Sequence, residues 1–124
     1  MPYAVCGGIK MRFEVLGRPM PKQRPRVGRH GNIYTPSETK AYEELVGIVA
    51  RQHCKEPQAG DISVAIEAYG KNIGDLDNIA KSILDGMSGI VYVDDRQVTE
   101  LSIRKMASGE EKVVVMVWQK ESQA

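Results

Sequence analysis

The stretch from Leu76 to Met87 places the strongest limit on how this chain of 124 residues can fold. Its apolar residues recur every three or four positions, which is the period of one face of an α-helix. Gly86 and Gly89 then signal turns. We therefore expect an amphipathic helix that must bury one face against other elements. The apolar residues of that face are Leu76, Ile79, Ala80, Ile83, Leu84 and Met87.

Acidic residues gather at the start of this helix and again shortly after its end. Asp75 and Asp77 fall in the first turn, where an Asp side chain can accept unpaired backbone N–H groups. A short apolar run then leads to Asp94 and Asp95. Converging carboxylates repel one another unless a cation lies among them, and oxygen ligands suit Mg²⁺ or Mn²⁺. The same acids could instead be helix caps and a turn, with Asp77 and Lys81 forming an ordinary ion pair four residues apart.

The combined pattern resembles the RusA family of Holliday-junction resolvases, which are small, dimeric, Mg²⁺-dependent endonucleases often carried by phages and prophages. The resemblance covers most of the chain, from about residue 9 to residue 118. Its specific part is Asp-Leu-Asp-Asn at 75–78, Lys81, Asp85, Val-Asp-Asp at 93–95 and Gln97-Val98.

The resemblance implies a role for each acidic position. The metal-binding and catalytic carboxylates would be Asp75, Asp77 and Asp95, with Asp94 in support. Lys81 would match the family's catalytic lysine beside the site. Some members carry a run of arginines directly before the first motif, whereas this chain has only Lys71 there. We therefore expect DNA contacts to come mainly from elsewhere.

A basic, proline-rich segment at residues 17–31 is the candidate for those contacts. It has three prolines, which rule out a regular helix, and no acid occurs between Val15 and Glu38. A long loop in a small domain is more often functional than idle, although a solvated, mobile loop is the simple alternative. The predicted DNA-binding residues are Lys22, Arg24, Arg26, Arg29 and Lys71.

Composition limits the class of protein. The chain is 42% hydrophobic and 27% charged, as expected of a single domain over residues 1–124 with flexible ends at 1–8 and 119–124. Residues 1–58 hold ten Lys/Arg against five Asp/Glu, and the rest holds seven against eleven. No run approaches a membrane span, and no signal peptide is apparent. Cys6 and Cys54 are expected to be free thiols in a cytoplasmic protein.

Periodicity along the remaining chain predicts the other elements. Alternating apolar residues predict strands at 9–15, 62–69, 98–106 and 113–118, the last apolar on both faces, with Leu101 and Ile103 pointing inward. A capping box at 35–38, with Pro36 in the first helical position, predicts a helix to about Lys55. Its buried stripe would be Ala41, Leu45, Ile48, Val49 and Gln52, widened by Tyr42 and Val46.

The predicted fold class is therefore α/β (α+β), in the order β-α-β-α-β-β. It would form a small mixed sheet with two helices packed on one face, leaving the other face or a strand edge for a partner.

The predicted function is a Mg²⁺-dependent endonuclease (Mn²⁺ a plausible substitute) that resolves four-way DNA junctions by paired nicks, as a homodimer. Exposed strand edges and the segment 113–118 are the candidate dimer contacts. Two alternatives stay open: a non-catalytic phage DNA-binding protein, and a Mg²⁺-dependent enzyme acting on a nucleotide-like phosphate.

Overall fold

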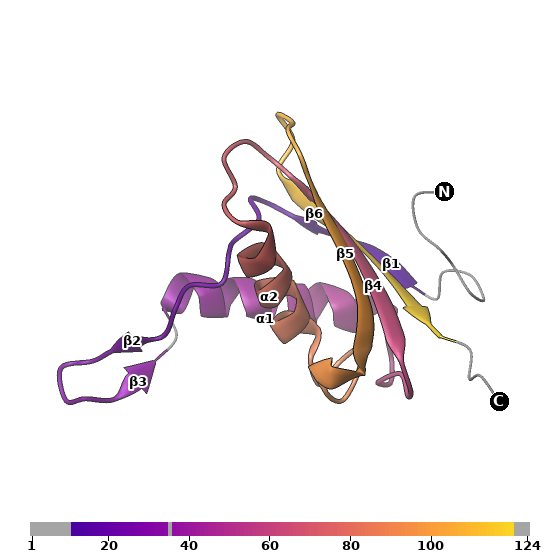
Figure 1. Ribbon diagram of the computed structural model, residues 1–124, viewed down its shortest axis with the longest axis horizontal. Helices are drawn as coiled ribbons and strands as arrows, with labels where there is room; N and C mark the ends of the chain where they lie inside the picture. Colours follow the sequence, from indigo (N-terminus) through magenta and orange to yellow (C-terminus); the bar gives the residue numbers. More distant parts are fainter. Residues whose placement is uncertain (1–10, 35, 121–124) are drawn as a thin grey trace.

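A four-stranded mixed sheet carries two helices on one of its faces (Figure 1). The computed structural model describes residues 11–34 and 36–120. The main elements are β1 (Met11–Leu16), α1 (Ser37–His53), β4 (Ile62–Tyr69), α2 (Leu76–Met87), β5 (Val98–Met106) and β6 (Lys112–Gln119). A hairpin of β2 (Arg26–Val27) and β3 (Ile33–Tyr34) lies between β1 and α1, and a 3₁₀ turn, η1 (Asp95–Gln97), precedes β5. The predicted fold class and main element order are confirmed.

The sheet has the strand order β1-β6-β4-β5. β6 runs antiparallel to both β1 and β4, whereas β4 and β5 are parallel and joined through α2. Figure 1 shows α1 and α2 on the same side of the sheet, as the crossover argument predicts. The sheet and this helix layer enclose the core.

β6 lies inside the sheet, which explains its continuous valines. Val113, Val115 and Val117 face the helices, in register with residues of β1 and β4 on either side. On the opposite face Val114 and Trp118 are also buried. Because β6 is internal, the segment 113–118 offers no open strand edge, and its role as a dimer contact stays a prediction.

The buried side of α1 differs from the predicted stripe. Tyr42, Val46 and Ala50 are buried, whereas Leu45 and Ile48 are exposed. Apolar residues surround most of this helix, so its orientation depends on what it contacts. α2 crosses α1 closely at Gly86, where an added Cβ would lie 2.8 Å from the Val46 Cβ. This close crossing buries the face of α1 that carries Val46.

Several predicted boundaries are corrected. α1 ends at His53, and Pro36 is its N-cap residue, so proline does not occupy the first helical position. The Pro36 carbonyl accepts a bond from the Lys40 N–H (3.1 Å), the role of an N-cap carbonyl. Thr35, the other half of the predicted capping box, lies outside the described residues. Gln119, placed in a flexible end, completes β6.

Two further expectations have mixed outcomes. Ile103 packs against the core as predicted, but Leu101 is 44% exposed because β5 is an edge strand that the helices cover incompletely. Cys54 is a free, buried thiol at the end of α1. Cys6 and the flexible end at 1–8 lie outside the described residues. Within the described ranges, no helix is long and apolar enough to cross a bilayer.

Candidate nuclease site and DNA-binding arm

The first turn of α2 presents two exposed carboxylates. Asp75 is the N-cap residue, and its backbone carbonyl accepts the Ile79 N–H at 3.0 Å, but its side chain makes no capping hydrogen bond. Within the described residues, the one hydrogen bond that the Asp77 side chain accepts comes from the neighbouring Asn78 N–H, at 3.0 Å. Capping therefore does not account for the Asp75 carboxylate, which leaves it available for a ligand.

The loop before α2, residues 70–74, is held in an unusual backbone conformation. Gly74 has φ +99°, and a Cβ there would lie 2.5 Å from Pro21. Arg18 donates to the Asn72 carbonyl at 2.7 Å and Lys105 to the Gly74 carbonyl at 3.0 Å. These contacts set the direction in which the acidic helix begins. The predicted DNA-binding residue Lys71 is exposed in this loop.

The second acidic pair lies in the turn that opens η1. Asp94 accepts bonds from the Arg96 N–H (2.9 Å) and from the Arg96 guanidinium (3.0 and 3.2 Å). The hydrogen bond from the Arg96 side chain, more than any other contact, lowers the pKa of Asp94 to about 2. Both Asp94 oxygens are thus engaged within the turn, whereas Asp95 points toward α2, where Lys81 lies 3.6 Å from its Oδ2.

Lys81 joins the two acidic segments. Its Nζ lies 3.2 Å from Asp85 Oδ1 as well as 3.6 Å from Asp95 Oδ2. Its partners are these two acids and not Asp77, which the alternative interpretation had paired with it. The hydrogen bond with Asp85 raises the pKa of Lys81, and Asp95 adds to this against the effect of burial. Lys81 is therefore a cation at neutral pH.

Asp85 extends this charge network to Lys22. Lys22 Nζ lies 3.2 Å from Asp85 Oδ2 and 2.5 Å from Glu43 Oε2 on α1. Partial burial acts to lower the Lys22 pKa, but the bonds to Glu43 and Asp85 outweigh it and raise the pKa. Lys22, predicted to bind DNA, is thus already paired with two carboxylates.

The structure brings only part of the predicted site together. Asp95 and Lys81 are in contact, and Asp75 and Asp77 share one helical turn. Among residues 11–34 and 36–120, however, no three Asp, Glu, His or Cys side chains lie close enough to hold one metal ion. The donors are all oxygen, which suits Mg²⁺, but the two acidic segments would have to move closer for a shared ion.

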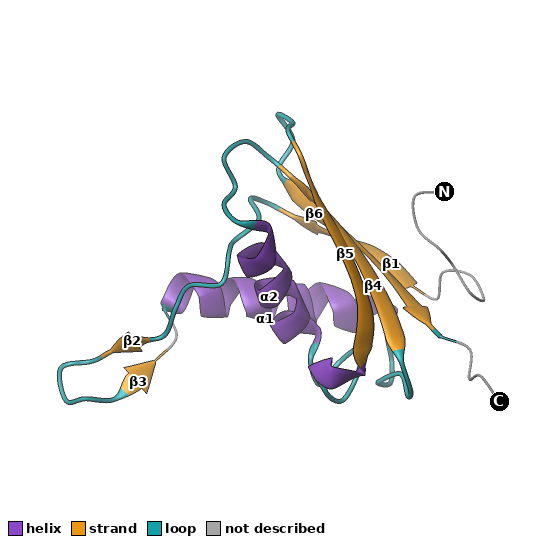
Figure 2. Cartoon of the chain, viewed as in Figure 1, coloured by secondary structure: helices purple, strands orange, loops and turns teal. Residues whose placement is uncertain are grey.

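The basic segment is attached beside the acidic helix. The Lys22 N–H donates to the Asn78 carbonyl at 2.8 Å, and Ser82 donates to the Met20 carbonyl at 2.7 Å. Figure 2 shows this segment as loop until it reaches β2. The chain therefore runs past the first turns of α2 before it leaves the body of the domain.

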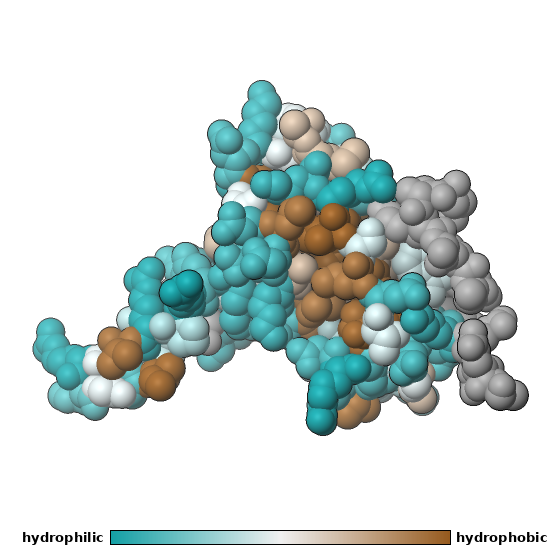
Figure 3. Space-filling view, viewed as in Figure 1, coloured by the Kyte–Doolittle hydropathy of each residue, from teal (hydrophilic) through white to brown (hydrophobic). Residues whose placement is uncertain are grey.

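Beyond this attachment the hairpin of β2 and β3 projects from the domain as an arm, residues 24–34 (Figure 1). Its predicted DNA-binding residues Arg24, Arg26 and Arg29 are exposed, and within the described chain none forms an ion pair. Val27 and Ile33 are more than 70% exposed, and they form the apolar patch on the arm in Figure 3. The arm therefore combines exposed arginines with two apolar side chains that remain largely exposed in the described chain.

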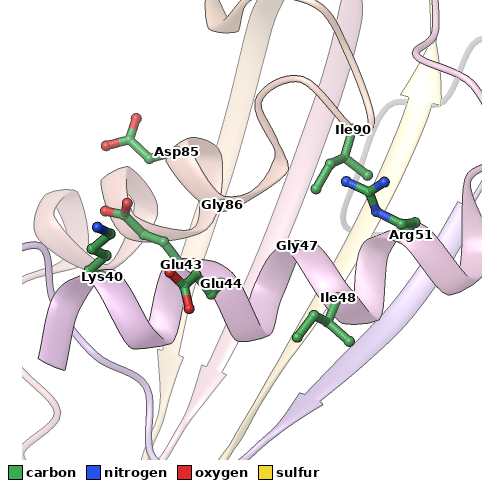
Figure 4. A pocket seen from close by; sticks show the side chains of 9 residues that line it. All are labelled: Lys40, Glu43, Glu44, Gly47, Ile48, Arg51, Asp85, Gly86 and Ile90. Carbon is green, nitrogen blue, oxygen red and sulfur yellow. The ribbon is translucent and has the colours of Figure 1, made fainter. Parts of the chain in front are cut away.

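A groove of about 480 Å³ lies between α1 and α2 (Figure 4). Gly47, Gly86 and Ile90 lie along it, with Glu43 and Asp85 among the charged residues around it. Asp75, Asp77 and Asp95 do not line it. Asp75 and Asp77 are exposed and Asp95 is half-buried, so the acidic residues predicted to act on DNA lie outside this groove.

Sequence reasoning missed the role of Gln97. Its side chain accepts from the Asp94 N–H and completes a capping box with the Asp94 side chain. The signal was present, because Asp-x-x-Gln at 94–97 has the spacing of a capping box.

Comparison with known proteins places this architecture in a family. The chain is similar to a Bacillus subtilis (strain 168) protein named Uncharacterized protein YqaN, with 28% identity over 86% of this chain and 94% of that protein. Residues 17–118, which include the arm, both helices and the acidic turn, match the family described as Endodeoxyribonuclease RusA. With that match over most of its length, the chain belongs to the RusA endodeoxyribonuclease family.

Proposed function

We propose that this protein is a divalent-metal-dependent nuclease that resolves four-way DNA junctions by paired nicks as a homodimer. Membership of the RusA family supports nuclease action on branched DNA. The observation that carries the proposal for this chain is the attachment of the basic arm to the acidic helix, through the Lys22 N–H and the Asn78 carbonyl. The basic segment that leads into the arm therefore runs beside the first turns of the acidic helix.

Asp75, Asp77 and Asp95 are the proposed ligands for Mg²⁺, or for Mn²⁺ as a substitute. A bound ion of this kind activates water and offsets negative charge on a phosphate. Asp94 supports the turn through its bonds to Arg96. Lys81, held as a cation by Asp85 and Asp95, neutralises the repulsion between the acidic segments and can contact a phosphate oxygen.

The arm and the loop before α2 are the proposed DNA contacts. Arg24, Arg26 and Arg29 on the arm and Lys71 in the loop are exposed cations. Phosphate neutralisation by such residues provides affinity without sequence preference, as recognition of a DNA branch by shape requires. Lys22 differs because its ammonium is held between Glu43 and Asp85, which favours a role in fixing the arm.

One observation favours a second candidate, a non-catalytic DNA-binding protein. No three potential ligands converge within the described parts of the chain. A nicking assay decides between the two, comparing a synthetic four-way junction with linear duplex, each with and without Mg²⁺.

We expect Asp75→Asn, Asp77→Asn and Asp95→Asn each to abolish Mg²⁺-dependent nicking, because ligands of one metal fail as a unit. Junction binding should stay equal or become tighter, since each change removes negative charge facing the DNA. Asp85→Asn should cause a smaller loss, because Asp85 holds Lys81.

Glu56→Gln, which removes one exposed charge beyond the end of α1, is the control and should change nothing. Nicking within a few-fold of wild type in all three main variants would exclude Asp75, Asp77 and Asp95 as the metal ligands. Absence of Mg²⁺-dependent nicking by the wild type on either substrate would favour the non-catalytic candidate.

A further inference from the structure

The side chain of Gln97 connects the loop at residues 58–60 with the turn at residues 93–95. In the described chain, no other side-chain hydrogen bond joins these two segments. The Gln97 Oε1 accepts the Val93 N–H at 2.9 Å and the Asp94 N–H at 3.1 Å. Its Nε2 donates to the Gln58 and Gly60 carbonyls, both at 2.9 Å. A glutamine amide has one acceptor oxygen and two donor hydrogens, so all of its polar groups are used here.

This bridge holds the acidic turn against the base of the sheet. Residues 58–60 precede β4, whereas residues 93–95 lie between α2 and β5. Val93 is 73% exposed, so packing of its side chain does not fix the turn. The preceding residues Val91 and Tyr92 are buried, and the Gln58 N–H donates to the Val91 carbonyl at 2.6 Å, so the chain is anchored just before the turn. The Gln97 side chain accepts from the amides of the next two residues, 93 and 94, which lead to Asp95.

We propose that Gln97 is a positioning residue for Asp95. By fixing the Val93 and Asp94 amides, it keeps the Asp95 carboxylate near Lys81 of α2. Gln97 itself contacts neither DNA nor metal in this role. The proposal rests on the proposed function, because the position of Asp95 matters only if Asp95 is a ligand.

Two variants separate the halves of the bridge. Gln97→Met has a similar length but makes none of the four hydrogen bonds. Gln97→Glu keeps acceptors for the Val93 and Asp94 amides but cannot donate to the Gln58 and Gly60 carbonyls. A thermal melt establishes that each variant is folded, and either folded variant suffices for the test.

Gln119→Met is the matched control. Gln119 donates to the Ala59 carbonyl at 2.6 Å, so it anchors the same loop. It lies on β6, however, and forms no hydrogen bond to residues 93–95. A general loosening of the 58–60 loop would affect this variant as much as the Gln97 variants.

The first measurement is amide hydrogen exchange in metal-free protein, followed by NMR. Exchange at Val93 and Asp94 should rise at least tenfold in Gln97→Met, rise less in Gln97→Glu and stay unchanged in Gln119→Met. The second is Mn²⁺ affinity by calorimetry without DNA. Loss of a residue that orients a metal ligand typically weakens metal affinity by about 10- to 100-fold, which we expect for Gln97→Met. The metal concentration for half-maximal nicking should rise in parallel, with the KM for junction DNA nearly constant.

The outcomes distinguish this proposal from the proposed function. Unchanged amide exchange in the Gln97 variants would overturn the bridge itself. Faster exchange with unchanged Mn²⁺ affinity, while Asp95→Asn abolishes Mn²⁺ binding, would overturn the positioning role alone. If Asp95→Asn leaves Mn²⁺ binding intact, the proposed metal site fails, and the positioning role fails with it.

Discussion

At the scale of single residues, neighbouring acids in the site have different surroundings. Arg96 engages both oxygens of Asp94, whereas Asp95 lies next to Lys81. Adjacent carboxylates thus differ in how readily they can take a new partner. The acid that is already hydrogen-bonded within its turn is suited to support, and the other is suited to ligation.

The Asp94–Arg96 contact makes a prediction about pH. The Arg96 side chain lowers the Asp94 pKa to about 2, so folding favours the ionised form. This contribution to stability is therefore present above an ordinary Asp pKa of about 4 and is lost as pH falls toward 2. Arg96→Gln should raise the Asp94 pKa most of the way toward the ordinary Asp value. The backbone N–H of residue 96 still donates to Asp94, so part of the lowering should remain. An NMR titration of the Asp94 carboxyl measures this, and a pKa that stays near 2 would assign the effect to the backbone.

At the scale of elements, the arm has few contacts of its own. A two-stranded hairpin is marginal by itself, and here β2 and β3 pair over only two residues each. Its base is held by Lys22, which bonds α1 and α2 at once. The arm is therefore a weakly supported element on a firm attachment, an arrangement suited to adapting to DNA.

The arm yields a prediction about salt. Changing Arg24, Arg26 and Arg29 together to Gln should weaken junction binding and reduce the log–log salt slope by about 0.9 per lost phosphate contact. Lys22→Gln is the comparison, because it should lower stability through the loss of two partly buried ion pairs while changing the slope less. Binding measured from low to high salt tests both. An unchanged slope in the triple variant would show that the arm does not contact phosphates.

At the scale of the whole molecule, the number of cuts is the main consideration. One copy of the proposed site would make one cut, whereas resolution of a four-way junction requires two symmetric cuts. A two-fold dimer would provide the second site. Because β6 is internal, the edges available for such a contact are β1 and β5.

The dimer prediction can be checked in two ways. Light scattering should give twice the 13.7 kDa chain mass, either for the free protein or on the junction. Mixing wild type with Asp77→Asn should produce dimers that nick only one strand of each junction. A monomer under both conditions, with paired nicks unaffected by mixing, would exclude the dimer.

The local sequence pattern was sufficient to predict much of the secondary structure, because helices and strands depend mainly on residues that are neighbours along the chain. The apolar spacing from Leu76 to Met87 identifies α2 to the residue, and the strand patterns identify the four strands of the main sheet. The short hairpin of β2 and β3 was not predicted. Prolines in the basic segment exclude a regular helix there by their missing N–H groups. The acidic motif also pointed to the RusA family, which the family match confirms.

Contacts between distant segments decided the rest. Apolar residues surround most of α1, so its own sequence did not select a buried face, and the close crossing at Gly86 did. Lys81 could pair with Asp77 by spacing, yet it pairs with Asp85 and Asp95 because folding brings the η1 turn within reach. Helical period describes neighbours on one surface, whereas ion pairs and burial depend on distances in space that only the packed sheet and helices establish.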